Sequence, residues 1–114
     1  MKKDDAVYLG HIMDLADKIR QRIEGKSRDD FDSNEDLRIV LTHLIQTIGE
    51  AARRVSSAFQ KDHPEVPWSD IIGMRHRIVH DYMDVDEDLV WDVATFELPA
   101  LVKKIEPLSP PPTP

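Results

Sequence analysis

Residues 35–55 read EDLRIVLTHLIQTIGEAARRV, and their apolar side chains recur at alternating spacings of four and three. This spacing lines them along one face of an α-helix. Glu35 and Asp36 suit the positive end of the helix dipole, and we expect Ser33 to cap the helix. The apolar face comprises Leu37, Leu41, Leu44, Ile48, Ala51 and Val55, and a second stripe comprises Val40, Ile45, Ala52 and Phe59. A helix with two apolar stripes has more than one neighbour, so this stretch predicts a central helix of a bundle.

One helix is expected before this stretch, and a connection on either side of it. Apolar residues at spacings of four and three predict a helix from Tyr8 to Ile23, which Gly25 ends. We expect residues 26–32, KSRDDFD, to form a polar connection. The two prolines of residues 61–67, KDHPEVP, end the helical pattern a second time.

Two further helices are expected after the second connection. Pro67 is suited to the first turn of a helix, and Trp68 to Tyr82 follow it. Asp84 and Glu87 have the spacing of a capping box for a last helix. Pro99 should kink that helix, because proline removes one hydrogen bond and crowds the preceding turn. The pattern as a whole predicts an all-α protein, an antiparallel bundle of four main helices.

Length and composition limit the function classes. The 114 residues predict one domain, residues 1–106, followed by a proline-rich tail, residues 107–114. The absence of cysteine excludes a disulfide framework, a thiolate zinc site and a cysteine nucleophile. The chain shows no signal peptide and no apolar run long enough to cross a membrane, so we expect a cytoplasmic protein. Its net charge of −7 argues against electrostatic coating of nucleic acid, so any phosphate-binding site must be local.

Residues 75–82, RHRIVHDY, collect cationic and proton-transferring side chains. Arg75 and His80 form the pattern R-x4-H. The spacing alone is weak, since this composition yields about 0.35 such pairs by chance. Arg38 and His43 have the same spacing, and we interpret that pair as structural because it lies in the apolar central helix.

Three interpretations of the cluster stay open from the residues alone. His76 and His80 have a metal-ligand spacing on a helix, but no glutamate adjoins His76 and the arginines would repel a cation. Arginine matches phosphate oxygens and histidine exchanges protons near neutral pH, so Arg75 and His80 suffice for metal-independent RNA cleavage. The third interpretation is a set of solvated side chains on an exposed helix face.

The charge pattern favours a phosphate site. Residues 71–80 contain Arg75 and Arg77 and no acid, a formal charge of +2. Residues 81–92 contain no base, and their formal charge is −6 from Asp81, Asp84, Asp86, Glu87, Asp88 and Asp92. Positive charge is therefore clustered within an acidic protein, and antiparallel packing could add Arg53, Arg54 and Lys61 to it.

The predicted helix poses a geometric problem for the pair. Positions five apart on an ideal helix point about 140° away from each other, so Arg75 and His80 do not share a face. Three solutions exist: the helix distorts near its end, the long arginine wraps around it, or each site takes residues from two chains. The third solution and the surplus apolar stripes favour a homodimer with this helix near a two-fold axis.

Two longer stretches carry a family resemblance. IGEAARRVS (residues 48–56) and HPEVPWSDIIGMRHRIVHDYMDVDEDLVWDVATFELPALVKKIE (residues 63–106) resemble the HepT-like branch of HEPN-domain proteins, the toxin halves of HEPN–MNT toxin–antitoxin modules. The resemblance extends from about Asp5 to Glu106 and rests on R-x4-H-x-Y between PW..IIGM and DVD..LVW. It implies a homodimeric helical bundle that cleaves RNA without a metal or other cofactor.

The resemblance also implies roles for residues of RHRIVHDY. Arg75 and His80 match the catalytic pair of the family. From their place beside this pair, we expect His76 and Arg77 to bind substrate or support the site. Tyr82 matches a tyrosine to which a partner, the minimal nucleotidyltransferase antitoxin, adds AMP and thereby silences the toxin.

Two departures from the family pattern bear on the strength of activity. His76 stands where asparagine is common, and Asp81 stands where glycine is common. The rival hypothesis is a non-catalytic protein of the same fold, in which the polar cluster binds a nucleotide or the surface of a nucleotidyltransferase partner.

Overall fold

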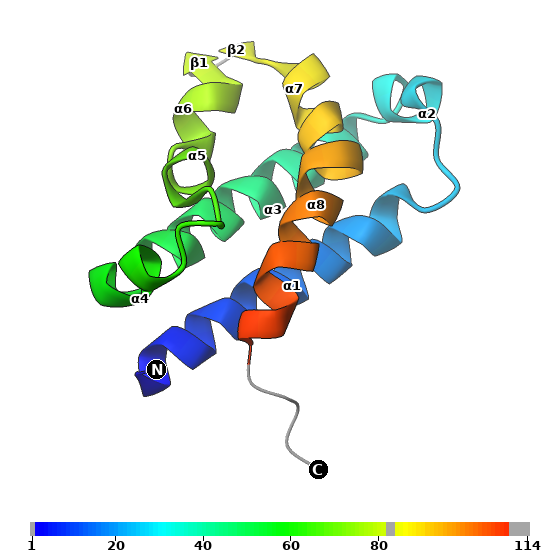
Figure 1. Ribbon diagram of the computed structural model, residues 1–114. Coiled ribbons are helices and arrows are strands. Elements are labelled where there is room, and N and C mark those ends of the chain that lie inside the picture. Colours follow the sequence, from blue (N-terminus) through cyan, green and yellow to red (C-terminus); the bar gives the residue numbers. More distant parts are fainter. Residues whose placement is uncertain (1, 82–83, 110–114) are drawn as a thin grey trace.

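Helices make up most of the chain (Figure 1). The computed structural model describes residues 2–81 and 84–109. In chain order, the elements are α1 (Lys3–Ile23), α2 (Arg28–Asp32), α3 (Glu35–Arg54), α4 (Ser57–Asp62), α5 (Trp68–Ile72), α6 (Met74–Ile78), β1 (Val79–Asp81), β2 (Asp84–Val85), α7 (Glu87–Asp92), the π-helical turn η1 (Val93–Glu97), α8 (Leu98–Ile105) and the 3₁₀ turn η2 (Glu106–Leu108). The predicted all-α class is confirmed.

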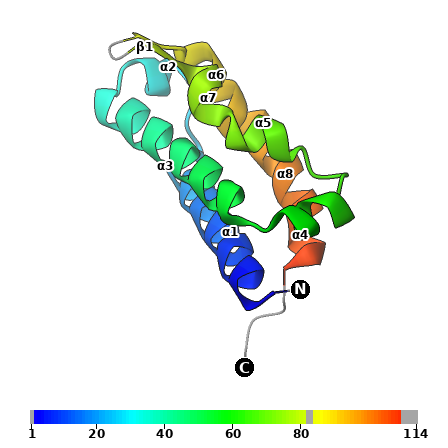
Figure 2. The same ribbon diagram turned by 90° about the vertical axis from the view of Figure 1, so that its left-hand side faces the viewer.

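The two long helices, α1 and α3, lie side by side in opposite directions and form one layer (Figure 2). A second layer consists of two legs, α5–α6 and α7–η1–α8, which the β1–β2 hairpin joins at one end of the molecule. Helix α3 packs against α1, α2, α5, α6 and α7. The prediction that residues 35–55 form a central helix is therefore confirmed.

The core lies between the two layers and follows the predicted apolar face with one shift. Leu41 and Ile48 are fully buried, as the spacing predicts. Leu44 is only half-buried, whereas Ile45 of the second stripe is buried. Because α3 has neighbours on several sides, its buried surface is broader than a single line of side chains.

The connection before α3 differs from its prediction. Residues 26–32 are not an open polar connection, because they contain the short helix α2, with a capping box between Ser27 and Asp30. Phe31 on α2 is fully buried, and its ring lies 5.1 Å from that of Trp91. Ser33 ends α2, and the side chain of Asn34 caps α3 by accepting from the Leu37 N–H at 3.0 Å.

The predicted third helix is wrong in its extent. The predicted helix is divided at Gly73 into α5 and α6. Helix α6 ends at Ile78, and residues 79–81 form the strand β1. A close approach to α3 positions α5: a Cβ placed on Gly49 would lie 2.9 Å from the Ile71 carbonyl oxygen. Only glycine leaves room for that backbone.

The last helix starts later than predicted and contains a π-helical turn. Asp86, not Asp84, caps α7 by accepting from the Leu89 N–H at 3.0 Å. The η1 turn lies just before Pro99, and the Leu98 N–H bonds to the Val93 carbonyl, five residues back. The wider turn accommodates a proline, which would otherwise crowd the preceding α-helical turn.

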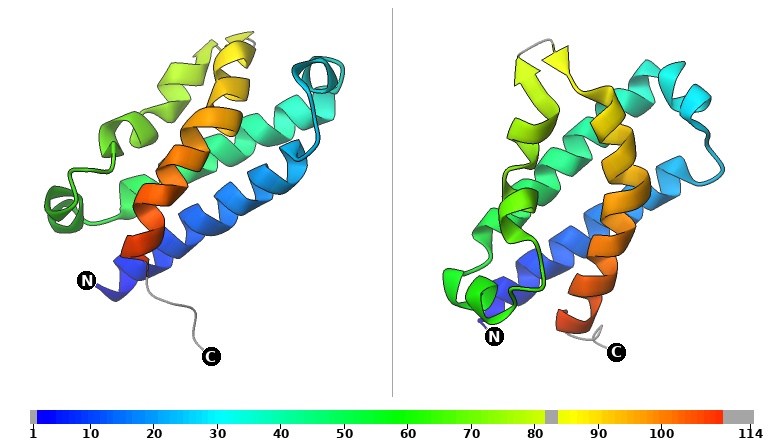
Figure 3. Two further views of the ribbon diagram at one scale, coloured as in Figure 1. Left: turned by 45° about the vertical axis from the view of Figure 1, so that its right-hand side comes forward. Right: turned by 45° about the horizontal axis from the view of Figure 1, so that its top comes forward.

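The N-terminus of α1 and the end of α8 lie at the end of the bundle away from the hairpin (Figure 3). The first residues of the predicted tail form η2, and Leu108 packs against the core. Residues 110–114 of that tail lie outside the described part. Among the described residues, none of the helices combines the length and apolarity that a bilayer crossing requires.

Candidate active site

The β1–β2 hairpin brings the acidic segment back against the cationic one. Val79 pairs with Val85 and Asp81 with Asp84, with an irregularity between them. The Asp86 N–H donates to the Ile78 carbonyl at 2.7 Å, which joins the end of α6 to the start of α7. The cationic and acidic segments, which are consecutive in the sequence, are therefore also neighbours in the fold.

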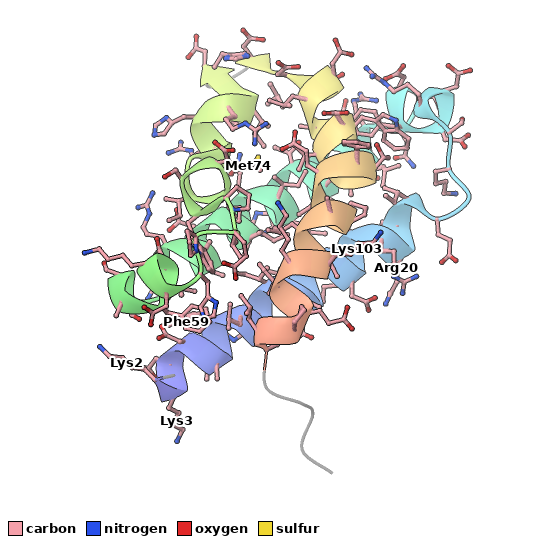
Figure 4. The ribbon with its side chains drawn as sticks, in the orientation of Figure 1. Lys2, Lys3, Arg20, Phe59, Met74 and Lys103 are labelled. Atoms are coloured by element: carbon pink, nitrogen blue, oxygen red, sulfur yellow. The ribbon has the colours of Figure 1, made fainter. Side chains whose placement is uncertain are left out.

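The two arginines of RHRIVHDY have different surroundings. Arg75 is exposed on α6, and no carboxylate of residues 2–81 or 84–109 forms an ion pair with it. Arg77 donates two hydrogen bonds to Glu97 of η1, at 3.1 and 3.0 Å, and these bonds raise its pKa. Arg77 also lies 3.7 Å from the sulfur of Met74, which points from α6 into the bundle (Figure 4). Arg75 is thus available to a ligand, while Arg77 joins the two legs.

His80 lies in strand β1, beyond the helix. Its side chain is 52% exposed, and its Nε2 lies 3.7 Å from Oδ2 of Asp86. Asp86 is therefore both the cap of α7 and the carboxylate that faces the imidazole. The sequence alone did not identify Asp86 in this second role, because the contact depends on the hairpin.

His76 is exposed on α6, and α6 ends before His80. The two histidines therefore do not lie on one helix, and the metal-ligand interpretation loses its geometric basis. Among the described residues, there is no group of three or more histidine, aspartate or glutamate side chains placed to hold a metal ion.

The angle expected between Arg75 and His80 on an ideal helix also does not apply, because α6 ends at Ile78. The premise of the first solution holds, because the helix ends at Ile78, between the two residues. Tyr82, the predicted modification site, lies outside the described residues, so its position stays a prediction.

Basic residues elsewhere have structural contacts. Arg38 donates to the Phe31 carbonyl at 3.1 Å and lies 3.3 Å from Glu87, which supports the structural interpretation of Arg38. Arg54 lies over the ring of Tyr8 on α1, 6.0 Å from its centroid, and Arg53 pairs with Glu50. At the last turn of α3, both arginines are far along the bundle from the hairpin (Figure 1).

Glu97 is a second residue that sequence reasoning missed. It lies twenty residues from its partner Arg77 and inside a turn whose π-helical geometry carries no local signal that we used. Asp86 had a signal, since an aspartate three residues before Leu89 fits an N-cap as well as Asp84 does.

Comparison with known proteins identifies the family of the chain. The family model described as Ribonuclease HepT-like matches residues 12–108. A protein named "Putative RNase TTE0752", from Caldanaerobacter subterraneus subsp. tengcongensis, is 31% identical over 99 residues, which cover 87% of this chain and 88% of that protein. A protein named "Probable ribonuclease HepT", from Thermococcus cleftensis, is 28% identical over 95% of this chain and 98% of its own length.

A third relative, "Putative RNase MJ1380" from Methanocaldococcus jannaschii, is 27% identical over 92% of this chain and 96% of its own length. No solved structure matches the chain at a significant level. The family model covers most of the chain, including Arg75, His80 and Asp86. The chain belongs to the HepT-like ribonuclease family.

Proposed function

We propose that the protein is a metal-independent endoribonuclease, the toxin of a HEPN–MNT toxin–antitoxin module. The observation that carries the proposal is the contrast between the two arginines. Arg77 is held by Glu97, whereas the exposed Arg75 has no ion-pair partner among the described residues and shares the hairpin end of the molecule with His80. An exposed guanidinium at the same end of the molecule as a half-exposed imidazole suits a phosphodiester.

The proposed chemistry needs no group that the chain lacks. A base removes the proton of a ribose 2′-hydroxyl, whose oxygen attacks the adjacent phosphate, and the 5′-oxygen leaves with a proton. His80 carries out proton transfer, and Arg75 stabilises the charge that develops on the phosphorane. His76, exposed on the same helix as Arg75, supports phosphate binding. We assign Arg77 a supporting role through the position of α6.

We further propose that the active form is a homodimer with α6 near the two-fold axis. One His80 cannot readily be base and acid for two proton transfers at once, and a second copy supplies another imidazole. Light scattering should give about twice the chain mass of 13.1 kDa. A monomer with full ribonuclease activity would contradict the shared site.

The direct test uses purified protein and a single-stranded RNA in the presence of EDTA. Cleavage should leave 2′,3′-cyclic phosphate ends, and His80→Ala should reduce the rate by about 10²–10⁴-fold. His43→Ala is the matched control, since His43 is exposed on α3 within the other R-x4-H pattern. Cleavage that requires added metal, or that survives in His80→Ala, would reject the mechanism, and no cleavage by the wild type would favour the non-catalytic rival.

The regulation that we propose is AMP addition to Tyr82 by a nucleotidyltransferase antitoxin. Each added AMP brings a phosphate charge close in sequence to His80 and a bulky group that would compete with RNA. Coexpression with the cognate nucleotidyltransferase should add about 329 Da per AMP, and Tyr82→Phe should block the addition. Protection of cells without any gain in mass would reject this switch.

A further inference from the structure

Just after the β1–β2 hairpin, the carboxylate of Asp86 faces the imidazole of His80, which lies in β1. Asp86 uses its two carboxylate oxygens differently: Oδ1 accepts from the Leu89 N–H at 3.0 Å, and Oδ2 lies 3.7 Å from Nε2 of His80. Its backbone is held too, because its N–H donates to Ile78 at 2.7 Å and its carbonyl accepts from Val90 at 3.0 Å. The backbone and one carboxylate oxygen of Asp86 are thus both held in place.

We propose that Asp86 is a positioning residue for His80, which fixes the tautomer of the imidazole for RNA cleavage. The inference rests on the proposed ribonuclease function and adds a residue to it. A carboxylate accepts hydrogen bonds and does not donate them when ionised. It therefore favours a neutral imidazole with its proton on Nε2 and leaves Nδ1 free as the base.

The cap explains why the carboxylate stays in place. Oδ1 is committed to the first turn of α7, so the carboxylate cannot rotate away from His80 without losing that hydrogen bond. The separation of 3.7 Å is longer than a hydrogen bond, and such contacts often tighten when substrate binds. A single residue thus couples the start of α7 to the orientation of the imidazole.

Within residues 2–81 and 84–109, Asp86 is the one carboxylate that forms an ion pair with His80. Asp84 lies in β2 and is exposed, and no ion pair joins it to His80 in the described part of the chain. Asp81, which follows His80 in β1, pairs with Asp84 in the sheet register. Asp84→Asn therefore removes one charge from the same hairpin and leaves the Asp86–His80 contact intact.

Asp86→Asn is the decisive variant because it separates the cap from the carboxylate. Asparagine caps helices about as well as aspartate, so its oxygen should keep the Leu89 bond and the stability of the protein. Its NH₂ group then occupies the place of Oδ2 and donates to Nε2 of His80. That donation favours the opposite tautomer, with the proton on Nδ1, where the base should be free.

The experiment measures rate, stability and tautomer for the full-length protein, Asp86→Asn and Asp84→Asn. We expect Asp86→Asn to lower kcat about 10- to 100-fold, with KM and the melting temperature close to those of Asp84→Asn. Nitrogen-15 NMR of the His80 ring at about pH 9, recorded with and without a 2′-deoxy oligonucleotide that cannot be cleaved, should show the protonated nitrogen move from Nε2 to Nδ1 in Asp86→Asn.

The outcomes distinguish this inference from the proposed function. Unchanged ring-nitrogen shifts in Asp86→Asn overturn the positioning role whatever the rate, and so does a kcat equal to that of Asp84→Asn. If the wild type does not cleave RNA, the proposed ribonuclease function fails. The NMR comparison then still decides whether Asp86 sets the tautomer of His80.

Discussion

The two ends of the bundle use a carboxylate in opposite ways. At the end that holds the N-terminus and α4, Asp5 is 2% exposed and accepts hydrogen bonds from both the N–H and the hydroxyl of Ser56, at 2.7 and 2.8 Å. At the hairpin end, Asp86 faces His80 across 3.7 Å, and both side chains are open to solvent. Buried polar groups that are fully bonded hold a fold together, whereas exposed groups held in place but incompletely bonded remain available to a substrate.

The electrostatics of Asp5 fit the structural end of this comparison. Burial alone would raise the pKa of Asp5, but the two hydrogen bonds from Ser56 and the charge of Lys2 outweigh it and lower the pKa. The ionised form is thus favoured in the folded state. The carboxylate connects the first turn of α1 to the junction of α3 and α4, two segments 51 residues apart.

The largest effect is expected from the two arginines at the hairpin end, where one side chain is exposed and the other is held by a carboxylate. Arg75→Ala should lower kcat/KM on RNA by about 10²–10³-fold without changing the melting temperature, because the guanidinium is exposed and acts on the transition state. Arg77→Ala should cost about 1 kcal/mol of unfolding free energy, because Glu97 loses a two-bond partner between the legs. RNA cleavage assays and thermal unfolding measure the two effects.

One outcome of these two variants would contradict the role assigned to Arg77. If Arg77→Ala loses as much activity as Arg75→Ala at full stability, then Arg77 binds substrate and the structural role of the Glu97 contact is wrong. Glu97→Gln separates the possibilities, since it weakens the contact and leaves Arg77 in place. It should reproduce the stability loss of Arg77→Ala only in part.

Asp5→Ala should have the next largest effect. We expect a loss of about 2–3 kcal/mol in unfolding free energy, since the N–H and hydroxyl of Ser56 lose a charged acceptor at a buried site. RNA cleavage by the folded variant should be unchanged. Asp4→Ala is the control, because Asp4 occupies the same first turn of α1 but is exposed.

The pH dependence of this difference has a defined sign. The folded-state pKa of Asp5 lies below its ordinary value of about 3.9, so the extra stability is complete above that value. It is lost as the pH falls through the folded-state pKa. Urea titrations should show the gap between wild type and Asp5→Ala narrowing in acid, and a gap that widens there would contradict the assignment.

A smaller effect is expected where α3 meets α5. Gly49→Ala should cost about 1–3 kcal/mol, because its methyl group would lie 2.9 Å from the Ile71 carbonyl oxygen and the backbone would have to move. Gly10→Ala is the matched control within α1, where no atom lies within 4 Å of the added carbon. It should stabilise the protein by about 0.5–1 kcal/mol, since alanine restricts the unfolded chain.

Calorimetry of the two glycine variants checks both signs. Equal effects at Gly10 and Gly49 would mean that helix propensity alone decides, and that the close approach of α5 carries no weight. If Gly49→Ala also lowers RNA cleavage while folded, then α5 transmits its position to α6 and the hairpin, and the separation between the two ends is incomplete.

Local sequence patterns were enough to predict a helix where apolar residues recur at a regular spacing. The spacing of apolar residues over 35–55 predicts α3 and its central place, because helical periodicity is a property of neighbouring residues. The same local rule failed at Trp68–Tyr82, where Gly73 divides the helix and the strand β1 replaces its end. Apolar residues continue through that stretch, so periodicity alone did not show where the helix stops.

The sequence by itself determined the all-α class and the cationic stretch RHRIVHDY, because composition and periodicity are properties of neighbouring residues. Its family resemblance singled out Arg75 and His80 as candidates. Only the tertiary structure decided which arginine is available and which carboxylate faces the imidazole. Glu97 reaches Arg77 across twenty residues, and Asp86 reaches His80 through a hairpin whose register depends on the packing of both legs on α3. Such contacts depend on the folded path of the backbone, which no short stretch of sequence specifies.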